Sequence, residues 1–204
     1  MPRTNPNGVR RLCNCPGGWT RCTLQRSAFT RSGDTMASRV QRFWLFKVEP
    51  SVFSIDDLAA APDQTTSWEG VRNYQVRNYL RDEITVGDGV LFYHSNTEPP
   101  AVVGRAEVVR AGYPDRYQFE IGHTYFDPKA DPANPRWYMV DIRYVDHFAA
   151  PISISELRST PGLENMELLR KGSRLSITPV TADEWRIVTA RGTSGAPVTS
   201  PLLR

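Results

Sequence analysis

The sequence predicts an α+β fold built on a small, curved or closed sheet that is mainly antiparallel, with short helices around it. Four or five short apolar runs, typical of strands, are interrupted by short helical segments without the regular strand–helix alternation of a parallel sheet. The 204 residues suit one domain with tails, and no run approaches the ~18 consecutive apolar residues of a membrane helix. We therefore expect a soluble, monomeric protein without a secretory signal or a membrane partner. It would be cytoplasmic, or nuclear in a eukaryotic cell.

Residues 1–39 differ in composition from the rest of the chain. They are rich in Arg, Gly, Pro, Ser, Thr and Asn, show no periodicity, and hold all three cysteines, Cys13, Cys15 and Cys22. We predict a disordered basic tail, with translation starting at Met36. The alternative is a basic arm that binds nucleic acid. The domain itself is predicted over residues 40–192, followed by a second disordered tail over 193–204.

Charge is divided unevenly between the tail and the domain. Residues 1–39 contain seven arginines and one acid, a net charge of +6, so the total of +3 leaves −3 for residues 40–204. Proteins that grip long duplex DNA through many phosphates have strongly basic bodies. Any nucleic-acid contact of this domain should therefore be local.

The first strand is predicted at Phe43-Trp-Leu-Phe46, where four large apolar residues run without a break. Such a run is typical of a strand buried on both faces. Alternation places Lys47 and Glu49 on one face at the end of this strand, and Pro50 ends it. These two charges are either a polar floor in an apolar pocket or ordinary surface charges.

The next segments contain signals for helix starts and stops. A capping box at Ser54 and Asp57 predicts a short helix that Pro62 ends, followed by a polar loop over residues 63–67. A second helix is predicted over residues 68–81. Asparagine is a poor helix former, and this helix would carry two, so its polar face is either functional or merely solvated.

The rest of the domain is predicted from similar patterns. Gly104 indicates a bulge or a close backbone approach in its strand. The remaining elements expected are strands at 90–94, 101–110, 137–145 and 174–177, a loop-rich segment at 113–135, a short helix capped by Ser153, a helix over 163–171, and a helix that begins at the capping box of Thr181 and ends at Ala190, before Gly192.

The side chains available for chemistry fit either the binding of a planar heterocycle or an ordinary aromatic core. The sequence has no glycine-rich phosphate loop, its three histidines lie on separate elements without metal-ligand spacing, and the domain lacks cysteine. We therefore expect no metal and no cofactor. Aromatic rings stack on a heterocycle, and amides or hydroxyls bind its edge. An aromatic core with polar fringes would have a similar composition. The aromatic, amide and hydroxyl residues that could hold a heterocycle are Trp68, Asn73, Tyr74, Asn78, Tyr93, His94, Ser95 and Asn96.

Five sequence blocks, taken in order, resemble the EVE domain family. They are Phe-Trp-Leu-Phe-Lys-Val-Glu-Pro-Ser at 43–51, Trp-Glu-Gly-Val-Arg-Asn-Tyr-Gln-Val-Arg-Asn at 68–78, Phe-Tyr-His-Ser-Asn at 92–96, Val-Gly-Arg-Ala-Glu-Val at 103–108, and Arg-Lys-Gly-Ser-Arg-Leu-Ser at 170–176. The resemblance covers about residues 42–191. It implies a PUA-like barrel with short peripheral helices, and a non-catalytic module that binds DNA or RNA carrying a modified base, such as a modified cytosine, flipped into a pocket.

The same resemblance implies the residues of the site. Trp68 or Tyr93 would stack on the base, and Lys47 together with arginines would hold the flanking phosphate. The implied pocket residues are Lys47, Glu49, Pro50, Trp68, Asn73, Asn78, Tyr93, His94 and Ser95, and the implied backbone contacts are Arg72, Arg77, Arg174 and Ser176.

The alternative function is that of an enzyme. Related ASCH domains include an amidohydrolase of modified nucleosides, whose lysine, hydroxyl residue and glutamate would correspond to Lys47, Ser51 and Glu49 here. A buried lysine with a lowered pKa could activate the hydroxyl of Ser51 as a nucleophile. A contact between Lys47 and Ser51 would favour this reading.

Overall fold

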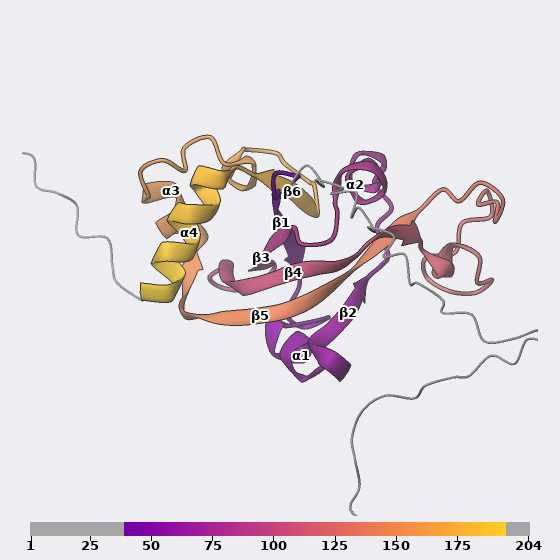
Figure 1. Cartoon of the computed structure of the whole chain (residues 1–204), viewed down its shortest axis with the longest axis horizontal. Helices are drawn as coiled ribbons and strands as arrows, with labels where there is room; N and C mark the ends of the chain where they lie inside the picture. Colours follow the sequence, from indigo (N-terminus) through magenta and orange to yellow (C-terminus); the bar gives the residue numbers. More distant parts are fainter. Residues whose placement is uncertain (1–38, 195–204) are drawn as a thin grey trace, which may run out of the picture. The chain divides into compact units, whose positions relative to one another are not determined.

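Six strands form one curved sheet in a computed structural model of the chain, which describes residues 39–194 (Figure 1). The tail over residues 1–38, the start at Met36, the three cysteines and residues 195–204 lie outside the described residues. The strands are β1 (Phe43–Val48), β2 (Thr65–Trp68), β3 (Gly89–His94), β4 (Ala101–Pro114), β5 (Tyr138–Ser153) and β6 (Ile177–Val180). The helices are α1 (Ile55–Ala60), α2 (Tyr74–Asn78), which a π-helical turn (Tyr79–Glu83) continues, α3 (Ile154–Ser159) and α4 (Ala182–Ser194).

The sheet is mixed and mainly antiparallel, as predicted. Its strand order is β2-β5-β4-β3-β1-β6, and only β1 and β3 run parallel among the paired strands of the described chain. The connection from β1 to β3 contains α1, β2 and α2, which gives it the length that a parallel crossover needs. None of the helices in residues 39–194 is long and apolar enough to cross a membrane.

β1 is buried on both faces, which explains its unbroken apolar run. Trp44 and Phe46 enter one core cluster, enclosed by the curve of the sheet, with α1 and α2. Leu45 enters a second cluster with residues of α3 and α4, and Phe43 stacks on Trp185 of α4 with ring centroids 4.5 Å apart. The predicted alternation is confirmed.

β4 and β5 are longer than the sequence predicts, and they curve together across the molecule (Figure 1). The apolar alternation of β5 ends near Val145, yet the strand continues, because its backbone pairs with β4 as far as Ser153, which lies opposite Ala101. Asp146 also forms an ion pair across this ladder with Arg105. The register shifts at Gly104, where a Cβ atom would lie 2.3 Å from the carbonyl oxygen of Asp146. The predicted bulge and close approach at Gly104 are both confirmed.

The predicted helix over residues 68–81 is wrong in its first half. Trp68 ends β2, and Gly70 has a φ of +77°, which a helix cannot contain. Asn73 is the N-cap of α2, since its side-chain oxygen accepts hydrogen bonds from the amides of Gln75 and Val76. The loop predicted over 63–67 is also wrong from Thr65 onward, where β2 pairs with β5.

The C-terminal third contains three further differences. The predicted helix over 163–171 is reduced to a 3₁₀ turn (Glu167–Leu169), and β6 begins at Ile177 instead of Arg174. α4 continues through Gly192 because the ring of Phe148 lies against this residue, where a Cβ atom would be 2.3 Å from the ring. The capping boxes predicted at Ser54 and Thr181 are confirmed, and the cap at Ser153 is a full box with Glu156.

Candidate functional site

A cavity of about 410 Å³ lies in the opening between the two edges of the sheet. One wall is β2 with the segment that follows it, and the other is the end of β1 beside the residue that enters β6. No strand pairing in the described part of the chain joins β2 to β6 across this opening. The lining residues are Lys47, Val48, Val52, Phe53, Thr66, Ser67, Trp68, Glu69, Gly70, Val71, Arg72, Tyr125 and Ser176.

A second cavity, of about 350 Å³, adjoins the first and shares Lys47, Val48, Val52 and Ser176 with it. The other residues of its lining are Glu49, Ser95, Ser173, Arg174 and Leu175. Ser173 has a buried hydroxyl without a hydrogen-bond partner among the described residues. The two cavities share a wall that contains Lys47, and we refer to the pair as the recess. We call the first the aromatic cavity and the second the serine cavity.

Trp68 forms the aromatic part of the first wall. Its indole packs on Phe46, with ring centroids 4.9 Å apart, and meets the edge of Phe92 at 5.8 Å. These contacts tie one side of the indole to the core, and the side chain is half-buried. Trp68 is therefore held rigidly where it lines the cavity, as a stacking surface should be.

Lys47 supplies a positive charge between the two cavities. It is half-buried, and burial lowers the pKa of its amine below the usual value, while the carboxylate of Glu167 acts in the opposite direction. Within residues 39–194 no acid lies in ion-pair distance of its amine, and no side-chain hydrogen bond holds it. The ammonium is free to bind an acceptor or an anion that enters the recess.

Hydrogen-bond acceptors lie on the β2 side of the aromatic cavity. Ser67 donates its hydroxyl to the carboxylate of Glu69 over 2.9 Å, and both residues line the cavity with Thr66. A carboxylate accepts hydrogen bonds from the exocyclic amine of cytosine. The apolar side chains of Val48, Phe53 and Val71 complete the lining, so the cavity combines polar and apolar surfaces.

Tyr125 closes the far side of the aromatic cavity, and Gly70 makes this possible. A Cβ atom on Gly70 would lie 2.4 Å from the Tyr125 ring, so the ring packs directly on the glycine backbone. Arg72 donates hydrogen bonds from Nε and Nη2 to the carbonyl oxygen of Tyr125, and its guanidinium lies 5.2 Å from the Tyr125 ring centroid. Tyr125 is thus fixed by a residue of the facing segment.

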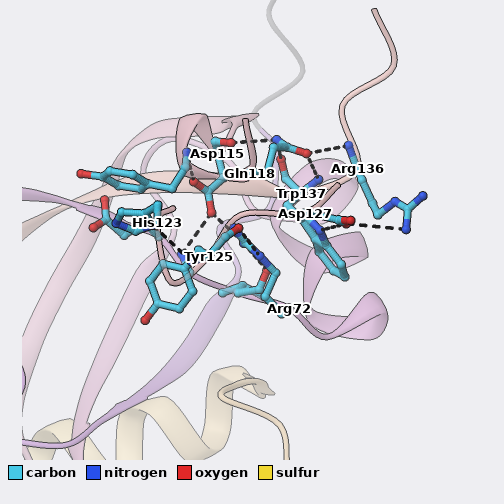
Figure 2. A network of polar contacts seen from close by, with 12 residues as sticks. Arg72, Asp115, Gln118, His123, Tyr125, Asp127, Arg136 and Trp137 are labelled. Atoms are coloured by element: carbon cyan, nitrogen blue, oxygen red, sulfur yellow. Dashed lines mark hydrogen bonds and ion pairs between the residues drawn. The ribbon is translucent and has the colours of Figure 1, made fainter. Parts of the chain in front are cut away.

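A buried carboxylate anchors this arrangement (Figure 2). Asp115 accepts hydrogen bonds from Arg72 Nη1 at 2.8 Å, from the amide of Gly70 at 3.1 Å and from the amide of Tyr117 at 2.9 Å. Asp115 also starts the segment 115–137, most of which lies in the loop-rich stretch predicted over 113–135 and which contains little regular structure. Its hydrogen bonds from Arg72 and Gly70 join this segment to the β2–α2 connection.

Side-chain hydrogen bonds hold the other end of the segment (Figure 2). Gln118 donates to the carbonyl oxygens of Asp115 and Trp137 and accepts from the amides of Arg136 and Trp137. Asp127 accepts a hydrogen bond from the Trp137 indole over 2.8 Å. A long loop thereby gains a defined position at the cavity.

Gly70→Ala should destabilise the protein more than Gly87→Ala, because only at Gly70 do other atoms crowd the position of the added Cβ. We expect a loss of about 1–3 kcal/mol from the left-handed backbone alone, and a further loss because the methyl group collides with Tyr125. Gly87→Ala is the matched control, since Gly87 has a φ of +88° and nothing within 4 Å of its Cβ position. Urea unfolding of both variants measures the difference. Equal losses would show that the contact with Tyr125 is loose.

Several residues implied by the resemblance do line this recess. Lys47, Trp68 and Arg72 line the aromatic cavity, and Ser176 lines both cavities. Glu49, Ser95 and Arg174 line the serine cavity, where Glu49 accepts a hydrogen bond from Asn96. The contacts of Arg72 with Asp115 and Tyr125 occupy its guanidinium, so its geometry suits a supporting position more than a phosphate contact.

The structure does not bring the other implied residues to these two cavities. Asn73 caps α2, Asn78 accepts a hydrogen bond from Arg77, and Arg77 also donates to the carbonyl oxygen of Arg136. Tyr93 is buried in the second core cluster, on the face of β3 opposite to Phe92, the residue that contacts Trp68. His94 accepts a hydrogen bond from the amide of Ile55 and lines a separate cavity, and burial lowers its pKa. Pro50 lies in the turn after β1 and lines neither cavity.

Glu69 and Tyr125 are cavity residues that the sequence did not indicate as such. Glu69 directly follows Trp68, and its position in a predicted helix concealed that it lines the same cavity. Tyr125 lies more than 50 residues from Trp68 in a segment without periodicity, and no local signal marks it.

The geometry does not favour the hydrolase alternative. Ser51 is exposed in the turn after β1 and lines neither cavity. Its hydroxyl forms no hydrogen bond with Lys47 in the described region, so the lysine–hydroxyl pair that the mechanism needs is not assembled. Among residues 39–194, no group of three or more histidine, cysteine, aspartate or glutamate side chains could hold a metal ion.

Comparison with known proteins gives one family. The model of the EVE domain matches residues 42–191, the range that contains all five sequence blocks. Human thymocyte nuclear protein 1 is 42% identical over 162 residues, covering 71% of this chain and 71% of that protein. A hypothetical protein from Leishmania major has a TM-score of 0.70 at 43% identity, covering 76% of this chain and 96% of that chain. Human THYN1 protein in complex with 5-methylcytosine containing DNA has a TM-score of 0.68 at 40% identity, covering 74% of this chain and 96% of that chain.

Proposed function

This chain belongs to the EVE domain family, and from this premise we propose that it is a non-catalytic nucleic-acid-binding module that holds a modified cytosine in the aromatic cavity. The base would leave its strand and enter the cavity as a single nucleotide. The protein would act as a monomer, in the nucleus of a eukaryotic cell and otherwise in the cytoplasm. The observation that carries the proposal is the combination of surfaces in this cavity.

Each surface of the cavity suits one part of a methylated cytosine. Trp68 and Tyr125 offer aromatic faces for stacking, and the carboxylate of Glu69 suits the exocyclic amine. Val48 and Val71 offer apolar surface to a methyl group. The complex of human THYN1 protein with DNA containing 5-methylcytosine supports the same choice of base.

The serine cavity is suited to the phosphates that flank the base. Lys47 and Arg174 bring two positive charges to it against the one carboxylate of Glu49, and Ser173 and Ser176 bring hydroxyl donors. Residues 40–204 have a net charge of −3, so these local groups would supply most of the attraction for the strand. Contacts limited to a few phosphates agree with a module that binds at one nucleotide.

The proposal is tested by fluorescence-polarisation binding of the full chain to oligonucleotides of one sequence. The strands carry cytosine, 5-methylcytosine, 5-hydroxymethylcytosine or N6-methyladenine at one position, as single strands and duplexes, in DNA and in RNA. We expect tighter binding to a strand with a modified cytosine than to its unmodified counterpart. Equal affinity for all strands would refute the proposal for these bases.

Lys47→Met should weaken binding of modified and unmodified strands alike, without a loss of stability. If the ammonium meets a phosphate, the slope of log affinity against log salt should fall by about 0.7–0.9. Because the pKa of Lys47 is lowered in the folded state, the protonated amine destabilises the fold at neutral pH. This cost disappears as the pH rises through the lowered pKa toward 10.5, the value for the unfolded chain. At neutral pH the variant should therefore be at least as stable as the wild type.

Lys171→Met is the matched control for this variant. Lys171 is exposed, carries the same charge, and lines neither cavity. It should keep the wild-type affinity and salt slope within error. A Lys47→Met protein with an unchanged salt slope would show that this amine does not contact the strand backbone.

A further inference from the structure

We propose that Val52 is a wedge, which enters the base stack of a duplex and fills the space that the flipped nucleotide leaves. This inference rests on the proposed function and adds its mechanism of base extraction. It assigns a positioning role to a residue that would touch the neighbouring base pairs and not the modified base itself.

The exposure of Val52 is the first observation. Its side chain is 74% exposed, although valine is apolar; its neighbours in the chain are the exposed Ser51 and the half-buried Phe53. Single exposed apolar residues are common, so exposure alone carries little weight. Among the exposed large apolar residues of the described chain, Val52 is the one that lines the aromatic and serine cavities. The others are Val40, Tyr74, Val86, Ile121 and Val145.

The position of Val52 is the second observation. It lines both cavities, as Lys47 does, and so lies at the rim between the space for the base and the space for the flanking phosphates. A strand that delivers its base to one cavity and its phosphate to the other must pass this rim. The stack from which the base comes would then lie over Val52.

The turn that carries Val52 is rigid. The carbonyl oxygen of Glu49 accepts hydrogen bonds from the amides of Val52 at 2.9 Å and Phe53 at 3.0 Å. Pro50 fixes one backbone dihedral of the turn, and Phe53 packs against the core. The β-branched side chain of Val52 has few rotamers. Little conformational entropy would therefore be lost when this side chain becomes buried between bases.

The physical need for a wedge follows from base flipping. Extraction of a base costs stacking and pairing energy and leaves a gap between two base pairs. Apolar side chains that insert between base steps are used by proteins that open or kink a duplex. Val52 would restore contacts to the two exposed base faces, and its own exposed surface would leave water. The wedge is needed only when the base leaves a paired, stacked duplex.

This requirement gives a sharp test with Val52→Ala. We expect roughly tenfold weaker binding to a duplex with 5-methylcytosine paired to guanine, because the gap stays unfilled. We expect less than a twofold change for the same methylated strand alone. 2-Aminopurine next to the methylated position should brighten on binding of the wild type and stay quenched more often with the variant. Val52→Leu should retain most of the duplex affinity.

Val86→Ala is the control, since Val86 is also an exposed valine, at 62%, but lines none of these cavities. It should bind both substrates as the wild type does, and thermal unfolding should show that all variants fold. If Val52→Ala bound the duplex with wild-type affinity, the wedge proposal would be wrong. It would also be wrong if the variant lost affinity equally for duplex and single strand, because that result indicates that Val52 only lines the cavity. A wild-type protein without any preference for methylated strands would overturn the proposed function and the wedge with it.

Discussion

Asp115→Ala is expected to lower the free energy of unfolding by about 3 kcal/mol. The Asp115 side chain is fully buried, and it accepts hydrogen bonds from one side chain and two backbone amides. Removal of one member of a buried ion pair typically costs about 3–5 kcal/mol. The Arg72 side chain is 24% exposed, so water partly solvates its charge when Asp115 is absent. The expected loss of stability therefore lies at the lower end of this range.

Urea unfolding of the full chain measures this loss, and Asp183→Ala provides the comparison. Asp183 pairs with Arg186 on the surface, where both side chains are at least 75% exposed, and such pairs contribute about 0–1 kcal/mol. Asp115→Ala should also lose affinity for the methylated strand, because Tyr125 loses its anchor. A loss of stability no greater than that of Asp183→Ala would contradict the role of Asp115 as the anchor.

Trp68→Ala should remove most of the preference for a methylated strand. Stacking of a base on an aromatic side chain contributes about 1–3 kcal/mol, so affinity for the methylated strand should fall roughly 5- to 150-fold. The variant also loses the contacts of the indole with Phe46 and Phe92, and some stability with them. Trp68→Phe keeps an aromatic ring at this position and should retain part of the preference.

Tyr93→Leu removes the ring of Tyr93 and so separates the two aromatic residues that the family resemblance offers for stacking. Tyr93 lies in the second core cluster, away from the aromatic cavity, and its hydroxyl makes no hydrogen bond with the described residues. We expect this variant to bind as the wild type does, while Trp68→Ala loses the methylated strand. Polarisation binding of both variants decides the question. If Trp68→Ala, under conditions where it is folded, kept the full preference for the methylated strand, Trp68 would not be part of the binding site.

The parts of the fold that the sequence predicts well depend on neighbours in the chain. β1 was predictable because an unbroken apolar run has few places other than between two cores. The caps at Ser54, Ser153 and Thr181 were predictable because each box forms within four residues. The family itself is confirmed, and the five blocks that indicated it include parts of β1, β3 and β4.

The parts that were wrong or missed depend on distant contacts. β2 is polar at Thr65, Thr66 and Ser67, and pairing with β5 alone makes it a strand. Tyr125 reaches the cavity because Asp115 and Gly70 hold the chain there, and their contacts span more than 40 residues. Neither relation leaves a periodic signal in the sequence. The same is true of Asn73, whose role as a cap depends on where β2 ends.

The two walls of the aromatic cavity belong to separate parts of the sheet: β5 holds β2, and β1 holds β6. A substitution that shifts β2 outward therefore leaves the ladder of β1 and β6 intact, and the converse also holds. The strand ladders alone therefore do not fix the width of the cavity; the contacts of Trp68 with Phe46 and Phe92, and those of Gly70 with Asp115 and Tyr125, hold the two walls in place. In this scaffold, the groups that shape the ligand site also contribute to the stability of the fold.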